Sequence, residues 1–414
     1  LLNGPESVTQ TIPSQRPNWI EIHLDNLAHN ISIFRQRIPA HCKILLPVKA
    51  DSYGHGSLAC SWAAAHAGVD WLGVAHLFEG VLLRQYGIRI PILILGTVTP
   101  EDFPSLVEFA LTPSIANSEL ALAFDKWLET QGLVHQAHLK VDTGMHRFGF
   151  QSTDLQEITS ILRCSHLRFT GMFSHLATAD MPGHEATPVQ IGRFTTLVKQ
   201  LQNLGLRPSL CHLANSAGVL KHPDCCYDMV RPGIALYGYN PMGAQPSLWP
   251  LRPVMRMRTT IRQIRTVPQG ESVSYGQYWT APRATRVATV AIGYGDGYMR
   301  GEVNQGWMFV RGKPCPILGR VCMDATMINV DDVPEAQVGD PVDAIHGELD
   351  PRISLEGIAE RCHTISYEIA TRVARRLYRL YHWQGQVLRW DELRAKLHIP
   401  DFQEKPDFLS SLPH

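Results

Sequence analysis

The feature that most constrains this chain is a regular alternation of short apolar segments with amphipathic segments before residue 250. Eight apolar segments have the length of buried strands: 43–48, 70–75, 91–95, 111–115, 136–142, 167–173, 208–213 and 226–230. Helical periodicity between them is clearest at 58–67, 103–110, 119–129 and 187–204. Eight strand–helix units in about 200 residues predict a (β/α)₈ barrel of the TIM type. A doubly wound sheet is the alternative, but the GxGxxG turn typical of that fold does not occur.

Beyond residue 250 the pattern changes to strand-like segments separated by glycine and proline turns. These segments are 254–267, 286–292, 307–310 and 327–330, and a helix is expected over 355–379 with a break at 363–367. The fold class is therefore α/β, with a mostly β second part. We expect a flexible lead-in (1–17), a barrel domain (18–250), a β-rich domain (251–385) and a C-terminal tail (386–414).

Charge and cysteine content exclude several classes of protein. Lys and Arg together number 38, as do Asp and Glu, so no excess charge attracts nucleic acid or an anionic membrane. No apolar stretch approaches the ~20 residues that span a bilayer, and no signal peptide is recognisable. The nine cysteines form no CxxC pair, which argues against a zinc site or a disulfide framework. We expect a cytoplasmic protein without a metal, a nucleic-acid partner or membrane contact.

Lys49 stands at the end of the first barrel strand, within PVKADSYGHG (47–56). Barrels place their chemistry at the carboxyl ends of their strands. A lysine that is partly desolvated there has a lowered pKa and can form a Schiff base. The alternative is an ordinary lysine that reaches from a strand end into solvent.

Other polar residues also follow strand ends and are expected to converge with Lys49 on one rim: Arg147, His175, Asn215, Ser216 and Arg231. Each has a structural alternative, such as a surface arginine, a core histidine or a helix cap. Ser216 and the pair Gly233-Ile234 follow the seventh and eighth strands, where such barrels often bind phosphate. A lysine suited to imine formation beside a phosphate site suggests pyridoxal 5′-phosphate (PLP).

Several ordered motifs give a specific resemblance. PVKADSYGHG, KVDTGMHRFGF (140–150), HLANSAG (212–218) with MVRPGIALYG (229–238), AIGYGDGY (291–298) and GRVCMD (319–324) resemble the alanine racemase family from about residue 19 to 379. This resemblance implies a fold-type III PLP enzyme with a barrel and a β domain. It also implies a two-base interconversion of L- and D-alanine that supplies D-alanine for peptidoglycan. The expected assembly is a homodimer whose subunits share active sites.

The resemblance assigns the two bases and the substrate contacts. Lys49 is the Schiff-base lysine and acts on the D-antipode, whereas Tyr294 acts on the L-antipode from the second subunit. Arg147 contacts the substrate carboxylate and the Tyr294 network, and Met323 offers its backbone N–H to that carboxylate. Lys140 matches a lysine that is carbamylated in many members and holds the arginine; the alternative is an ordinary ion pair, for example with Asp142.

The resemblance also assigns the cofactor contacts. Arg231 faces the pyridine nitrogen, and because a guanidinium group rarely loses its proton, that nitrogen stays unprotonated. His175 orients the arginine. The phosphate contacts are Tyr53, Ser216, Gly233, Ile234 and Tyr367, and Asn215 matches a neighbouring position whose role stays open.

Three other functions fit parts of this pattern. A serine or broad-specificity racemase could use the same scaffold, although a tyrosine at position 367 favours the methyl side chain of alanine. A fold-type III amino-acid decarboxylase is disfavoured by AIGYGDGY and GRVCMD. A non-catalytic PLP-binding protein made of the barrel alone would have no second domain.

Overall fold

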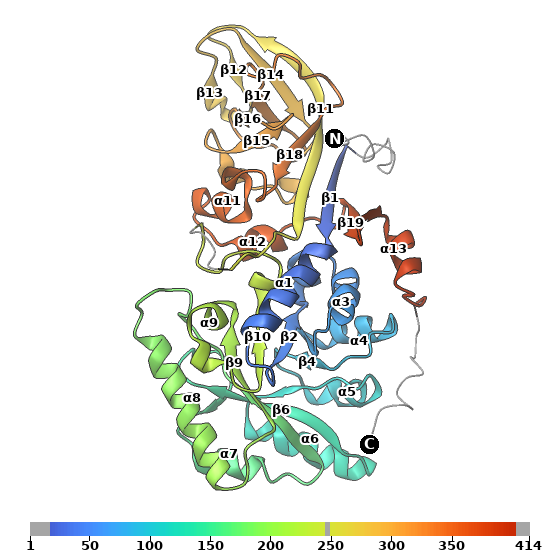
Figure 1. Cartoon of the computed structure of the whole chain (residues 1–414), viewed down its shortest axis with the longest axis vertical. Coiled ribbons are helices and arrows are strands. Elements are labelled where there is room, and N and C mark those ends of the chain that lie inside the picture. Colours follow the sequence, from blue (N-terminus) through green and yellow to red (C-terminus); the bar gives the residue numbers. More distant parts are fainter. Residues whose placement is uncertain (1–16, 245–248, 403–414) are drawn as a thin grey trace.

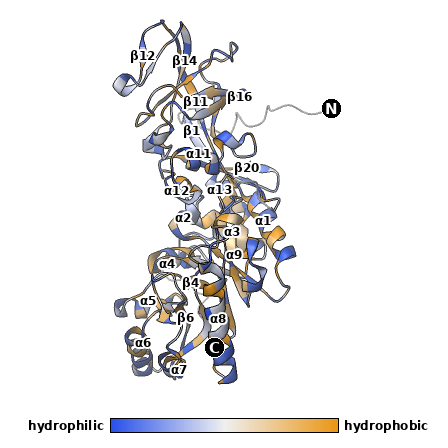
Figure 2. Cartoon of the chain, turned by 90° about the vertical axis from the view of Figure 1, so that its left-hand side faces the viewer, coloured by the Kyte–Doolittle hydropathy of each residue, from blue (hydrophilic) through white to orange (hydrophobic). Residues whose placement is uncertain are grey.

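The computed structural model describes residues 17–244 and 249–402, so residues 1–16 of the expected lead-in and 403–414 of the expected tail (386–414) lie outside the described residues. The described part of that tail contains a strand and a helix. Figure 1 shows two parts along the long axis, with a barrel below and a mostly β part above. Figure 2 shows helices α2 (Lys49–Tyr53) and α12 (Ser366–Thr371) at the junction of the two parts.

Eight parallel strands form the barrel. They are β2 (Lys43–Pro47), β3 (Trp71–Val74), β4 (Ile92–Ile94), β5 (Ser114–Ile115), β6 (His135–Asp142), β8 (Leu167–Phe173), β9 (Leu210–Asn215) and β10 (Met229–Arg231). Their order is β4-β3-β2-β10-β9-β8-β6-β5, and a parallel bridge between Leu93 and Thr112 brings the two ends of this order together. The predicted (β/α)₈ barrel is confirmed. A separate apolar cluster from several strands, which includes Leu45, Phe173 and Met229, fills part of its interior.

Helices surround the barrel (Figure 1). They are α1 (Leu24–Arg37), α3 (Ser57–His66), α4 (Leu77–Gln85), α5 (Phe103–Glu108), α6 (Ser118–Gln131), α7 (Leu155–Ile161), α8 (Ala186–Asn203), α9 (Ser216–Lys221) and α10 (Gly233–Leu236). Helix α6 shows why the sequence forms them. Asn117 caps it by accepting a hydrogen bond from the Leu120 N–H, Phe124 and Leu128 are buried on one face, and Gly132 ends it with φ = +65°.

The upper part is built on a second sheet of order β16-β15-β18-β11-β1-β19-β20, in which β14 pairs with β11 and β17. Its strands are β1 (Asn18–His23), β11 (Met255–Val267), β14 (Thr285–Val290), β15 (Trp307–Val310), β16 (Lys313–Pro316), β17 (Thr326–Asn329), β18 (Pro341–Ile345), β19 (Tyr378–Trp383) and β20 (Gln386–Leu388). Smaller elements are β12 (Ser272–Val273), β13 (Trp279–Thr280), α11 (Leu355–Arg361) and α13 (Trp390–Lys396), whereas the short β7 (Phe150–Gln151) pairs with β6 of the barrel. The helix expected over 355–379 does break after α11, but it ends with α12 at Thr371, and β19 follows.

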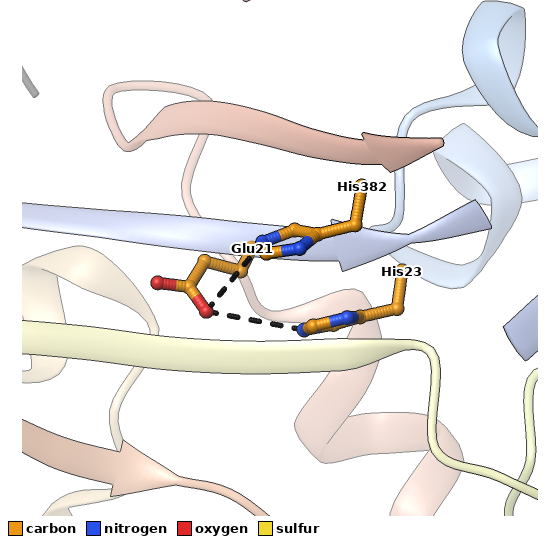
Figure 3. Close-up of side chains that lie close together, drawn as sticks. All are labelled: Glu21, His23 and His382. Carbon is orange, nitrogen blue, oxygen red and sulfur yellow. Dashed lines mark ion pairs between the residues drawn. The ribbon is translucent and has the colours of Figure 1, made fainter. Parts of the chain in front are cut away.

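The first described strand of the chain lies in this upper sheet, between β11 and β19. Glu21 and His23 project from the same face of β1, and His382 of β19 is in register with His23 (Figure 3). The two imidazole rings stack with centroids 4.0 Å apart. Their Nε2 atoms lie 3.9 and 3.7 Å from Oε2 of Glu21. Arg256 contacts the same oxygen at 3.4 Å, and Arg258 contacts Oε1 of Glu21 at 3.3 Å.

This cluster has the character of a charge network rather than of a metal centre. The imidazole planes differ by only 23°. A metal ~2 Å from one Nε2 and in the plane of that ring would therefore lie well outside the plane of the other ring. Two guanidinium groups already neutralise the carboxylate, and they lower the pKa of Glu21 against the opposing effect of its burial. The network joins the first strand of the described chain to the last long strand.

Within the described ranges, no helix has both the length and the apolar character needed to cross a lipid bilayer.

The half-buried His23 predicts acid sensitivity. Burial first, and then the neighbouring His382, lower the pKa of His23 from 6.5 to about 4. Between these values the unfolded chain binds a proton more tightly than the folded chain, so stability is lost as pH falls below 6.5. His23→Gln should therefore reduce the loss of unfolding free energy between pH 7 and pH 5, measured by urea titration. The same change at the exposed His41 is the control, and equal slopes for both variants would contradict the assignment.

Candidate active site

A cavity of about 390 Å³ opens at the carboxyl ends of the barrel strands. It collects ten of the residues predicted from the sequence: Lys49, Tyr53, Lys140, Arg147, His175, Asn215, Ser216, Arg231, Gly233 and Tyr367. Helix α12 supplies Tyr367, so the upper part of the molecule closes one side. A larger hollow of about 660 Å³, which Trp62 of α3 and Leu397 border, contains none of the predicted residues. The predicted convergence on one rim is therefore what the structure shows.

Lys49 is followed by a turn with left-handed backbone conformation. The residues at 50–53 all have positive φ, between 51° and 55°, although none is glycine. Left-handed backbone costs roughly 1–2 kcal/mol for each such residue. Hydrogen bonds within the turn offset part of this cost, since Ser52 N–H donates to the Val48 carbonyl and Gly54 N–H to the Ala50 carbonyl. The turn places Lys49 and Tyr53 on the same cavity.

Two charged side chains from other elements hold this turn. Glu79 of α4 accepts a hydrogen bond from the Ala50 N–H at 2.7 Å through Oε1. Its Oε2 accepts from the N–H groups of residues 75 and 76, which follow β3. Arg379 of β19 donates to the Gly54 carbonyl and to the Asp51 carboxylate, each at 3.2 Å. The turn is thus tied to both the barrel and the upper sheet.

One end of the cavity carries hydroxyl groups. Tyr53 and Tyr367 pack edge to face with ring centroids 5.8 Å apart, and the Ser216 Oγ accepts a hydrogen bond from the Ala235 N–H. A Cβ atom at position 233 would lie 2.9 Å from the Tyr53 hydroxyl, so any other residue there would require the Tyr53 side chain to shift. Hydroxyl groups beside a glycine form an environment that suits a phosphate group.

Two residues predicted for this end have other contacts. Asn215 lines the cavity, but its Oδ1 caps α9 by accepting from the Gly218 N–H. Ile234 is fully buried in α10 and its side chain does not line the cavity, which leaves only its backbone N–H to approach a ligand.

Arg231 lies on the floor of the cavity and is only 4% exposed. Its Nη2 donates to the Ser174 carbonyl at 2.6 Å and lies 3.3 Å from His175 Nδ1. Its Nη1 lies 2.9 Å from His212 Nδ1, and the His212 ring stacks on Phe173. The predicted contact between His175 and Arg231 is therefore present, and His212 adds a second imidazole partner.

The cavity has an excess of positive charge. Lys49, Lys140, Arg147 and Arg231 line it, and among the described residues no Asp or Glu does. Burial, followed by the charges of Arg147 and Arg231, lowers the pKa of Lys49 from its usual 10.5, although Glu79 opposes this shift. A larger fraction of the Lys49 amine is therefore neutral, as a nucleophile or base requires.

Lys140 is the most constrained of these cations. Its ammonium group lies 3.9 Å from the centre of the Phe173 ring, and burial, helped by Arg231 and Arg147, lowers its pKa well below 10.5. The alternative ion pair with Asp142 is not formed in the described chain. That carboxylate instead accepts from the N–H groups of residues 144–146 and pairs with the His146 ring at 3.2 Å.

Tyr294 and Met323 lie away from this cavity. Both side chains are exposed, at 41% and 54%, and neither lines the cavity. Their loops are joined to each other, because Tyr294 N–H donates to the Cys322 carbonyl and Gly295 N–H to the Met323 carbonyl. Within the described residues, no hydrogen bond from the Met323 N–H is formed.

Three residues of this site were not predicted from the sequence. Glu79 and Phe173 carry no distinctive motif, and a glutamate in a helix or a phenylalanine in a strand is ordinary. His212 begins the quoted motif HLANSAG, so its position at a strand end could have indicated it.

Glu79→Gln tests how the left-handed turn is held. Glutamine keeps one oxygen acceptor but turns an amide NH₂ toward N–H groups that now donate to the second oxygen. Losing these charge-assisted bonds should lower the free energy of unfolding by about 1–3 kcal/mol, measured by urea titration. Glu119→Gln, an exposed change in α6, is the matched control. Equal midpoints for the two variants would show that Glu79 does not stabilise the turn.

This chain is similar to known proteins along most of its length. The model of the alanine racemase N-terminal domain matches residues 22–241, and that of the C-terminal domain matches 254–381. The alanine racemase of Symbiobacterium thermophilum is 38% identical over 373 residues, which cover 89% of this chain and 98% of that protein. That of Nostoc sp. is 37% identical over 89% of this chain and 96% of its own length.

Solved structures show the same relationship. Alanine racemase of Clostridium difficile 630 superimposes with a TM-score of 0.84 at 33% identity, over 91% of this chain and 98% of that one. Alanine racemase from Bacillus anthracis with bound L-Ala-P gives 0.83 at 32% identity, over the same shares of the two chains. With both domains matched and full-length relatives well above 30% identity, this chain belongs to the alanine racemase family of isomerases.

Proposed function

We propose that this chain interconverts L- and D-alanine with PLP bound in the barrel cavity. The observation that carries the proposal is the charge of the cavity: four basic side chains line it, and none of the lining residues that the structure describes is Asp or Glu. A cofactor phosphate and a substrate carboxylate are both anions, and both are stabilised by such surroundings. The family to which the chain belongs uses PLP.

The cavity has the chemical layout that PLP requires. The Lys49 amine would hold the cofactor covalently. Tyr53, Ser216, Tyr367 and the backbone at Gly233 and Ile234 would hold its phosphate. When bound, the cofactor supplies an electron-withdrawing group that makes the proton on the substrate Cα acidic. Arg231, fixed by Ser174 and the imidazoles of His175 and His212, would keep a facing ring nitrogen unprotonated.

Inversion at Cα needs one base on each face of the substrate. Lys49 is the base on one face, since burial and the nearby arginines lower its pKa and so leave a larger fraction of the amine unprotonated. Tyr294 is the base on the opposite face. Because Tyr294 is exposed and does not line the cavity of its own chain, we infer that a second subunit brings it to the site.

The same reasoning applies to the substrate carboxylate. Arg147 of the cavity and the Met323 N–H would bind it from the two subunits, which explains why that N–H has no acceptor among the described residues. A carbamate on Lys140 would add a negative charge beside Arg147 and remove an unpaired buried cation.

The nine unpaired cysteines support a reducing compartment such as the cytoplasm, where D-alanine is available for peptidoglycan.

A chiral assay of the purified holoenzyme tests the proposed reaction. The enzyme should convert L-alanine to the racemate, with serine a poorer substrate because the bulky Tyr367 ring, which lines the cavity, favours a methyl side chain. Lys49→Ala should lose the visible absorbance of bound PLP and at least about a thousandfold in activity. Lys43→Ala, at the exposed start of the same strand, is the control. Covalent cofactor in Lys49→Ala, or no racemisation by the parent, would refute the proposal.

Mixed dimers test the sharing of the site. Lys49→Ala and Tyr294→Phe subunits are each expected to be inactive as homodimers. In a heterodimer both lesions can fall in one site, which leaves the other site intact. About half of the parent activity per dimer should then return, on the assumption of independent sites. An isolated heterodimer without activity would contradict sharing in trans.

A further inference from the structure

Arg376, which lies in the loop between α12 and β19, bridges two carboxylates of the Tyr294 region. Its Nε donates to Asp296 Oδ1 at 2.8 Å, and its Nη2 donates to Asp324 Oδ1 at 2.6 Å. Asp296 lies two residues after Tyr294, and Asp324 lies one residue after Met323. The guanidinium group therefore joins the loop that carries Tyr294 to the loop that carries Met323.

The contacts around this bridge are close and directional. Asp296 is only 2% exposed, and its Oδ2 accepts from the Gly293 N–H at 3.1 Å, on the other side of Tyr294. A Cβ atom at position 295 would lie 2.7 Å from Arg376 Nη2 and 3.0 Å from the Met323 carbonyl oxygen. The guanidinium thus packs directly against the backbone that follows Tyr294.

A second contact ties the loops to the segment that also carries Tyr367. The Ala374 N–H donates to the Asp296 carbonyl at 3.1 Å. A Cβ atom at position 297 would lie 2.3 Å from the Arg372 carbonyl oxygen, so the chain segments approach as closely as glycine allows. The position of Arg376 is fixed by these contacts on both sides.

We propose that Arg376 is a positioning residue that fixes the Tyr294 hydroxyl relative to the Met323 N–H through its bridge between Asp296 and Asp324. This inference rests on the proposed role of Tyr294 as the second base. The planar guanidinium donates through two nitrogens at a fixed angle, and a lysine in its place could supply only a point charge. The guanidinium group and the Asp324 carboxylate are exposed, at 49% and 64%, so this half of the bridge contributes little stability by itself, and its expected effect is on geometry rather than on folding.

A misplaced Tyr294 would affect the two directions of racemisation differently. Tyr294 removes the Cα proton of L-alanine, whereas Lys49 removes that of D-alanine. If Tyr294 is misplaced, its proton transfer becomes slower relative to the transfer at Lys49. The primary isotope effect on kcat/KM should then rise with α-deuterated L-alanine and fall with α-deuterated D-alanine. A loss of folded enzyme would lower both rates and leave both isotope effects unchanged.

The test compares Arg376→Ala and Arg376→Lys with Arg375→Ala, a change at the exposed neighbour. Arg376→Ala should lower kcat about ten- to a hundredfold in both directions, as expected for a small misplacement of a catalytic group. The two isotope effects should diverge as described, and Arg376→Lys should show a smaller divergence. Hydrogen exchange of a peptide spanning 291–298 should be faster in Arg376→Ala, because the amides of residues 294 and 295 bond across the bridged loops.

Further variants separate the possible outcomes. Asp324→Asn alters the exposed end of the bridge and should shift the isotope effects in the same directions as Arg376→Ala. This variant tests the positioning role even if Arg376→Ala fails to fold. Unchanged isotope effects and unchanged exchange in folded Arg376 variants would overturn the positioning role. If Tyr294→Phe retained full activity, the assignment of Tyr294 as the second base would itself fail. If Tyr294→Phe lost activity but the Arg376 variants kept the parent's isotope effects and hydrogen exchange, only the positioning role of Arg376 would be refuted.

Discussion

The hydrogen bond between Glu79 and the Ala50 N–H fixes the most strained part of the molecule. Four consecutive residues other than glycine hold left-handed backbone directly after Lys49, a conformation that isolated chains rarely adopt. The turn persists because Glu79 from the barrel and Arg379 from the upper sheet bind it from two sides. Strain at a site that presents two ligand-binding side chains is typical of preorganised active sites. Here it sets where Lys49 and Tyr53 stand relative to each other.

The surrounding charge then determines the chemistry. Lys49, Lys140, Arg147 and Arg231 are brought together with no Asp or Glu among the described residues of the cavity lining, which is costly unless an anion is bound there. Burial, together with the charges of Arg147 and Arg231, lowers the pKa of Lys49, so the arrangement that favours anionic ligands also suits the role of base proposed for this lysine. The fold supplies these cations from the ends of different strands, as barrels commonly do.

The proposed second base stands in a different setting. Tyr294 and Met323 are exposed in the upper part, and neither is among the described residues that line the barrel cavity. A base that is proposed to serve another subunit gains from being positioned before the subunits meet, because each new adjustment on association adds an entropic cost. The bridge from Arg376 to Asp296 and Asp324 gives the two loops such a fixed arrangement.

By itself, the sequence determined the barrel, because eight apolar segments alternating with helices can bury their strands in few other ways. It also indicated part of the site, since residues that follow parallel strands gather at one rim, and Lys49, Arg147, His175, Asn215, Ser216, Gly233 and Arg231 line one cavity. Tyr53, Lys140 and Tyr367, which line the same cavity, were expected only from the resemblance of the motifs. Only the tertiary structure revealed Glu79, His212 and Arg376, whose roles depend on contacts between segments far apart in the chain. It also decided that β1 pairs with β11 and β19, because strand pairing between distant segments is not encoded in local periodicity.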